Sequence, residues 1–137
     1  MNTRPGRLRH VAPLFFVRDV VAATEYYVRA LGFTQPPYWG DPPAFAMPSR
    51  DGVVIMLKRA QSGDPIRSNN PGAQSGDGGW DAYVWVDDAR ALHSEMAAAG
   101  AEVAYGPQLQ ESYGNWEFAV RDRDGYLVAF GSDADTE

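Results

Sequence analysis

The chain has 137 residues, of which 45% are hydrophobic and 22% charged, with a formal net charge of −6. This length is enough for one soluble globular domain with a core, and the negative charge makes a nucleic-acid backbone a poor partner and a cationic ligand a favourable one. The sequence contains no cysteine, which excludes disulfides, thiolate metal ligands and a cysteine nucleophile and suits a cytoplasmic protein. No apolar run is long enough to cross a bilayer.

The first predicted elements are an apolar strand and a helix. The segment "APLFFVRDVVAATEYYVRALGF" reads as a strand that ends just before Asp19 and a helix that follows it. Asp19 is a favourable N-cap, because its short carboxylate can accept the unpaired N–H groups of the first turn. Gly32 is predicted to end the helix with a positive φ. Further on, the Asp51-Gly52 dipeptide precedes "VVIML", which predicts a tight turn and a strand.

The second half of the chain presents the same features in the same order. Asp88 follows the apolar segment "DAYVWV", Gly100 ends the next helical segment, and the Asp124-Gly125 turn separates two apolar strands. The two halves are offset by about 70 residues. Chance agreement between two common patterns is the alternative, but four features in one order favour an internal repeat.

A segment rich in Gly, Pro, Ser and Asn lies between the two halves and predicts a linker loop. We therefore expect an α+β fold and a single domain, 1–137, with one module over 10–59, the linker over 60–79 and a second module over 80–132.

Two segments carry a resemblance to a known family. These are "YYVRALGF" at the end of the first helix and "YGNWEFAVRDRDGYLVAFG" near the C-terminus. From about residue 11 to 131, the chain resembles the vicinal oxygen chelate superfamily of glyoxalases, bleomycin-resistance proteins and dioxygenases, and most closely its metal-free bleomycin-resistance branch. The resemblance implies two βαβββ modules that curve around a cleft, and a homodimer whose clefts use both chains. It also implies an N-terminal arm that crosses to the partner, and Pro13 fits a hinge there.

Enzymes of this superfamily bind a divalent metal through His, Glu or Gln side chains. The resemblance implies that the ligand positions are Ala12, Met56, Asp81 and Ala129 in this chain. A single aspartate cannot hold a catalytic metal, because such a site needs about three protein ligands. We therefore predict no metal and no cofactor.

Neither histidine restores the ligand set. His10 lies two residues before Ala12, so it would share a strand face with Ala12 if the strand extends that far, yet with Asp81 it would give only two ligands. His93 falls in the second predicted helix, on a face that we expect to be solvent-exposed. Both are predicted as surface or tail residues.

Strand alternation divides the apolar side chains between a core face and a cleft face. The predicted core face carries Phe15, Val17, Ile55, Leu57, Val84, Val86, Val128 and Phe130. The predicted ligand-binding residues on the strands are Leu14, Phe16, Val54, Met56, Asp81, Tyr83, Trp85 and Ala129. In loops near the rims, Tyr38, Trp39, Phe45, Trp80, Tyr113 and Trp116 are further candidates, although each could instead complete a core or a dimer contact.

This aromatic face predicts a protein that binds and sequesters an aromatic or cationic natural product, such as a bleomycin-like peptide antibiotic, without catalysis. The role would be antibiotic resistance, or carriage of a secondary metabolite during its biosynthesis. The alternative is a glyoxalase-like enzyme (a lyase, isomerase or dioxygenase) with a degenerate or absent metal site, in which Asp81 or Glu117 acts as general base. Glu117 has two interpretations besides, a structural carboxylate near the dimer contact or an anion that faces the ligand.

Overall fold

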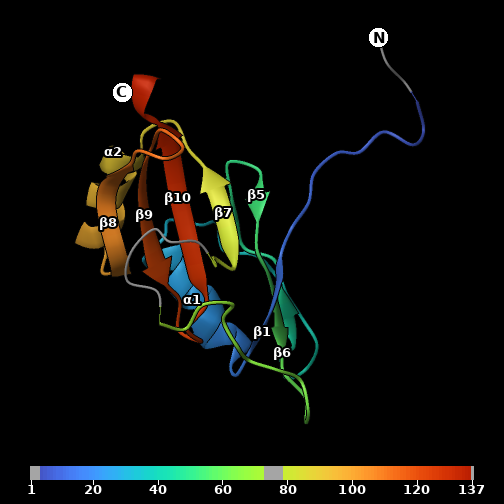
Figure 1. Ribbon diagram of the computed structural model, residues 1–137. Helices are drawn as coiled ribbons and strands as arrows, with labels where there is room; N and C mark the ends of the chain where they lie inside the picture. Colours follow the sequence, from blue (N-terminus) through green and yellow to red (C-terminus); the bar gives the residue numbers. More distant parts are fainter. Residues whose placement is uncertain (1–3, 73–78, 137) are drawn as a thin grey trace.

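The computed structural model describes residues 4–72 and 79–136 and contains two four-stranded sheets, each with its own helix (Figure 1). The first module consists of β1 (Leu14–Val17), α1 (Val20–Arg29), β2 (Tyr38–Trp39), β3 (Phe45–Ala46), β4 (Ser49–Arg50), β5 (Val53–Val54) and β6 (Met56–Arg59). The second module consists of β7 (Ala82–Trp85), α2 (Ala89–Ala98), β8 (Glu102–Gln110), β9 (Asn115–Arg121) and β10 (Leu127–Asp133), followed by the short 3-10 helix η1 (Ala134–Thr136).

The two sheets have the same topology. Their strand orders are β1-β6-β3-β2 and β7-β10-β9-β8, and in each the first strand pairs in parallel with the last while the other pairs are antiparallel. The second module is strand, helix and three strands, and the first has the β4–β5 hairpin inserted between β3 and β6. The predicted α+β fold with two βαβββ-like modules is confirmed.

Both helices begin after the predicted caps, and Gly100 directly follows the α2 cap Ala99 as predicted, but α1 ends earlier than predicted, at Arg29 with Ala30 as its cap. Asp19 and Asp88 each accept a hydrogen bond from the backbone N–H three residues ahead, at 3.1 and 3.0 Å. Gly32 and Gly100 have φ values of +75° and +97°, which a residue with a Cβ adopts only at a cost. Neither α1 nor α2 is long and apolar enough to cross a membrane, and no other helix in the described ranges is.

The first Asp-Gly turn is confirmed, but the strand after it is shorter than predicted. Asp51 and Gly52 both have positive φ and form a two-residue turn between β4 and β5. Ile55 then interrupts the apolar run "VVIML", because Val53–Val54 pair with β4 whereas Met56–Arg59 pair with β1 and β3. One predicted strand is therefore two short strands in different sheets.

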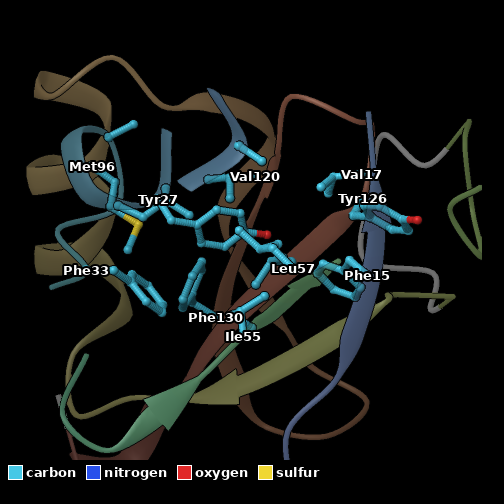
Figure 2. Close-up of a cluster of buried hydrophobic side chains, with 14 of the residues drawn as sticks. Phe15, Val17, Tyr27, Phe33, Ile55, Leu57, Met96, Val120, Tyr126 and Phe130 are labelled. Atoms are coloured by element: carbon cyan, nitrogen blue, oxygen red, sulfur yellow. The ribbon is translucent and has the colours of Figure 1, made fainter. Parts of the chain in front are cut away.

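One hydrophobic core joins the modules (Figure 2). Helix α1 packs on β3 and β6, and α2 packs on β8, β9 and β10. Tyr27 and Met96, one from each helix, are fully buried beside side chains of both sheets. Of the predicted core residues, six are buried, and Val84 and Val86 are half-buried against the same cluster; the six are Phe15, Val17, Ile55, Leu57, Val128 and Phe130.

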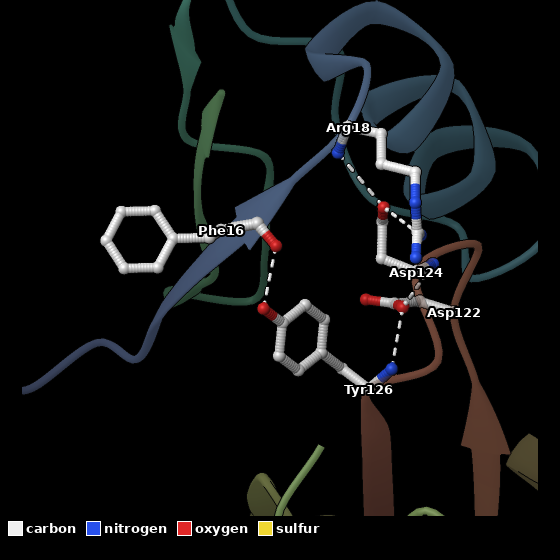
Figure 3. A network of polar contacts seen from close by, with 5 residues as sticks. All are labelled: Phe16, Arg18, Asp122, Asp124 and Tyr126. Atoms are coloured by element: carbon white, nitrogen blue, oxygen red, sulfur yellow. Dashed lines mark hydrogen bonds and ion pairs between the residues drawn. The ribbon is translucent and has the colours of Figure 1, made fainter. Parts of the chain in front are cut away.

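Polar contacts also join β1 to the β9–β10 turn (Figure 3). The Tyr126 hydroxyl donates to the Phe16 carbonyl at 2.7 Å. The backbone N–H and the guanidinium of Arg18 both donate to Asp124 Oδ1, each at 3.0 Å. The turn that forms the C-terminal hairpin therefore also fixes the first strand of the other module.

Candidate functional site

Three aromatic rings stand in a row on the outer side of the second sheet. Trp80 precedes β7, and Tyr83 and Trp85 project from it on the side away from the half-buried Val84. The ring centroids of Trp80 and Tyr83 are 4.7 Å apart, and those of Tyr83 and Trp85 are 5.2 Å apart. Trp85 is 68% exposed although it is large and apolar. We call these three rings the aromatic face.

A buried carboxylate lies beneath the aromatic face. Glu117 on β9 is 0% exposed and accepts hydrogen bonds from three tyrosine hydroxyls. Tyr83 and Tyr113 donate to Glu117 Oε1 at 3.0 and 2.5 Å, and Tyr105 donates to Oε2 at 2.5 Å. Hydrogen bonds to a carboxylate are among the strong ones, so three donors stabilise this charge in place of water.

Two of these hydroxyls also accept a hydrogen bond. Tyr83 Oη accepts from Asn115 Nδ2 at 2.9 Å, and Tyr105 Oη accepts from Trp80 Nε1 at 2.8 Å. Burial is the main cause that raises the pKa of Tyr83 to about 12, and the Glu117 charge raises it as well. The same two causes raise the pKa of Tyr105 and of Tyr113 further. The three phenols therefore stay protonated at neutral pH and serve as donors to Glu117.

A glycine makes room for this network. Gly131 on β10 lies opposite Glu117 in the β9–β10 register. A Cβ built on Gly131 would lie 1.9 Å from Tyr83 Oη, far closer than any real contact. Only a residue without a side chain leaves room for the Tyr83 hydroxyl at the position from which it reaches Glu117.

The floor below the rings is made of small apolar side chains. Leu127, Ala129 and Ala119 are fully buried and form a second cluster with Tyr105, separate from the main core. Ala129 is the residue that pairs with Tyr83 across β7 and β10. This floor supports the rings, and the phenol hydroxyls and Glu117 are the polar groups next to it.

Another group of predicted site residues shares the outer side of the first sheet. Phe16 pairs with Lys58, Lys58 with Phe45, and Phe45 with Trp39, whose ring centroid is 5.6 Å from that of Phe45. Leu14 and Met56 form the next row. Within the described part of the chain, no ring contact links this group to the aromatic face. The predicted residues thus fall into two groups, one on each sheet.

Three predicted site residues lie elsewhere. Tyr38 packs against the main core, and Val54 is half-buried on the β4–β5 hairpin. Trp116 belongs to β9 rather than to a loop, so alternation turns it to the side opposite Glu117, where Arg90 lies 4.3 Å above its ring.

Asp81 holds the linker against the second sheet. Its Oδ1 accepts from the Asn69 N–H at 2.7 Å, and its Oδ2 accepts from the Ser68 hydroxyl at 2.6 Å and the Leu127 N–H at 2.7 Å. Part of the predicted linker is therefore fixed to the start of β10, whereas 73–78 lie outside the described residues. Asp81 has both oxygens occupied, although it stands beside the aromatic face.

The residues at the family's metal positions do not fit a metal. Ala12, Met56 and Ala129 offer no oxygen or nitrogen ligand from their side chains, and Asp81 is occupied as described. Within residues 4–72 and 79–136, no three side chains of His, Cys, Asp or Glu are gathered so as to hold an ion.

The two histidines differ in environment. His10 is exposed in the N-terminal segment, as predicted. His93 was predicted to face solvent, and this is wrong: its ring is half-buried and meets Phe118 edge to face, with centroids 5.3 Å apart. The helix face that carries His93 therefore packs on β9, which the sequence pattern of α2 did not reveal.

A cavity opens beside the aromatic face, at the edge of β7. It has a volume of about 440 Å³ and lies between the β4–β5 hairpin and α2. Phe33, Val84 and Met96 line its apolar wall, and Trp85 stands between it and the rest of the aromatic face. Such a volume falls within the range of small-molecule pockets.

The fold and the sequence together define the family. The family model described as Glyoxalase/Bleomycin resistance protein/Dioxygenase superfamily matches residues 7–130. The chain belongs to this superfamily, as its resemblance indicated. Curated protein sequences contain no significant match to the chain.

Solved structures of similar fold include binding proteins and enzyme-related proteins. A bleomycin-binding protein from bleomycin-producing Streptomyces verticillus, complexed with copper(II)-bleomycin, is 25% identical, with 90% of this chain and 95% of that chain covered and a TM-score of 0.64. TnmS3, an antibiotic binding protein from Streptomyces sp. CB03234, is 18% identical over 92% and 97%, with a TM-score of 0.67. A glyoxalase-related enzyme from Clostridium phytofermentans is 15% identical over 96% and 99%, with a TM-score of 0.71. The latter two likenesses concern the fold alone.

Proposed function

We propose that this protein binds and sequesters a flat aromatic natural product without altering it chemically, and that it does so in the cytoplasm. The observation that carries the proposal is the row of Trp80, Tyr83 and Trp85 above the buried Glu117. Flat rings stack on exposed aromatic side chains, and a nearby carboxylate favours a cationic ligand. Sequestration of an antibiotic for resistance, or carriage of a secondary metabolite, needs tight binding only.

Two further observations support a binding role. The cavity beside Trp85 offers room for a part of the ligand that extends past the rings. The structural relatives include the bleomycin-binding protein at 25% identity, which was solved in complex with copper(II)-bleomycin. Both agree with a ligand larger than a single ring system.

An enzymatic role would need a carboxylate that can reach a proton of the substrate. Asp81 accepts three hydrogen bonds from the linker and β10, and Glu117 accepts three from tyrosines while fully buried. A general base must lie within hydrogen-bond reach of its substrate. These occupied oxygens favour the binding role over the glyoxalase-like alternative.

The first test is a titration of the four tryptophans by fluorescence, with metal-free bleomycin and 9-aminoacridine as ligands. We expect saturable quenching with one site per chain, no effect of EDTA, and recovery of unchanged ligand by mass spectrometry. Trp85→Ala should weaken binding about tenfold, because stacking and cation–π contacts contribute on the order of 1–2 kcal/mol. Trp116→Phe, on the other side of the sheet, should leave affinity unchanged. Quenching by neither ligand, or quenching that requires a metal, would contradict the proposal.

We also propose that the protein is a homodimer whose N-terminal arm packs on the partner. The segment 4–11 extends away from both sheets (Figure 1), and Leu8 and Val11 within it are 93% and 91% exposed. Apolar side chains in such a segment gain stability only when another surface covers them. Double substitution of Leu8 and Val11 by Asp should shift sedimentation from dimer to monomer, whereas Arg4→Ala should not. A wild-type protein that sediments as a monomer at all concentrations would refute the dimer.

A further inference from the structure

The hydrogen bonds of the tyrosine network leave one acceptor open. The hydroxyls of Tyr83, Tyr105 and Tyr113 all donate their protons to Glu117. The oxygens of Tyr83 and Tyr105 also accept, from Asn115 and Trp80. Tyr113 Oη accepts from no described residue. Its phenol oxygen therefore still has a lone pair to offer, and the residue is 43% exposed.

The Glu117 carboxylate, to which this hydroxyl donates, is stabilised by hydrogen bonds but not by an ion pair. None of the described cationic side chains lies within ion-pair distance of Glu117. The Tyr113 hydroxyl bonds the carboxylate at 2.5 Å, which polarises the phenol and makes its oxygen a better acceptor. Because Tyr83 and Tyr113 donate to the same Oε1, this acceptor lies next to the middle ring of the aromatic face.

We propose that Tyr113 Oη, held by Glu117, anchors a protonated amine carried by the flat aromatic ligand. This inference rests on the proposed function and names its ligand class: planar aromatic cations with an N–H donor at the ring or close to it. The phenol protons all point at Glu117, so the anchor accepts hydrogen bonds and offers none. A ligand that brings only carbonyl or carboxylate groups to this place would be bound less well, because these groups would lose their water and find no hydrogen-bond donor.

The test uses two probes that share one ring skeleton. At neutral pH 9-aminoacridine is protonated, whereas acridine is largely neutral. Dissociation constants of both are measured by fluorescence for the wild type, Tyr113→Phe and Glu117→Gln. We expect the wild type to bind the cation at least about tenfold more tightly, as for a hydrogen bond to a charged group. Tyr113→Phe, which keeps the ring, should remove most of this preference and change acridine binding by less than about twofold.

Controls separate the anchor from folding and from general charge. Glu117→Gln keeps the shape of the side chain and should also reduce the preference, while Glu111→Gln removes one negative charge from the same exposed loop and should not. Thermal unfolding checks that each variant is folded, and Tyr113→Phe, at a half-exposed site, keeps the test decisive should Glu117→Gln unfold.

The outcomes distinguish the two proposals. Equal binding of both probes to the wild type, or a preference that survives in Tyr113→Phe, would overturn the anchor and leave the aromatic face as a binding site. Binding of neither probe would overturn the anchor, and if metal-free bleomycin does not bind either, the proposed function falls with it. Loss of the preference in Tyr113→Phe and its retention in Glu111→Gln would establish the anchor.

Discussion

The free energy of unfolding of the wild type, measured relative to that of Asp122→Asn, is expected to fall by roughly 3 kcal/mol as the pH rises from about 4 to 7. Burial raises the pKa of Asp122 from 3.8 to about 6, although hydrogen bonds from Tyr27, Tyr126 and Asp124 partly oppose this. Between these pH values the folded protein still holds the proton and the unfolded chain has lost it. Rising pH therefore favours unfolding across this window, and the effect is complete above about pH 6.

Urea unfolding at a series of pH values measures the effect. The amide that Asp122→Asn introduces would keep an oxygen for the backbone N–H groups of Asp124 and Tyr126, and its NH2 group could donate to the Tyr27 hydroxyl, so the variant should fold. Since Tyr27 lies on α1 and Asp122 in the β9–β10 turn, the variant tests a contact between the modules. Asp41→Asn, at an exposed position, is the matched control, and its difference in unfolding free energy from the wild type should not change with pH. A difference for Asp122→Asn that is also independent of pH would contradict the role of the buried Asp122 carboxyl.

The fold could be predicted because its landmarks are local. A cap such as Asp19 and a turn such as Asp51-Gly52 act within a few residues, and each was recognisable from residue type and position. Strand alternation likewise predicted that Tyr83 and Trp85 share a face. The interruption at Ile55 was missed, because it depends on which sheet each part of the run joins.

The tyrosine network could not be predicted, because it depends on register between distant strands. Tyr105 reaches Glu117 from β8, whose pairing with β9 shifts on both sides of Tyr105. Irregularities of this kind change which side chains share a face. The Gly106-Pro107 pair within "EVAYGPQLQ" is a signal for a bulge, but it does not give the register that results. The presence of Glu between aromatic residues in "NWEF" was the one available signal. Trp116 was misplaced for a related reason, since β9 begins one residue before it.

Gly131→Ala is expected to lower the free energy of unfolding by about 2 kcal/mol. The new Cβ would occupy the position of Tyr83 Oη, so the Tyr83 ring must swing away from the sheet. That movement breaks its hydrogen bonds to Glu117 and Asn115 and leaves the buried carboxylate with one donor fewer. It also displaces the middle ring of the aromatic face, so binding of 9-aminoacridine should weaken together with stability.

The effect of Gly131→Ala on the free energy of unfolding should have the opposite sign when Tyr83 is replaced by a small residue. Gly131 has no positive φ, and an alanine in the middle of a strand is more favourable than a glycine by roughly 0.5–1 kcal/mol. In a Tyr83→Ala background, Gly131→Ala should therefore stabilise the protein. Urea unfolding of the four proteins of this double-mutant cycle measures the coupling between the two positions. Equal destabilisation by Gly131→Ala in both backgrounds would mean that the glycine serves the backbone of β10, and that the position of Tyr83 over Glu117 does not depend on it.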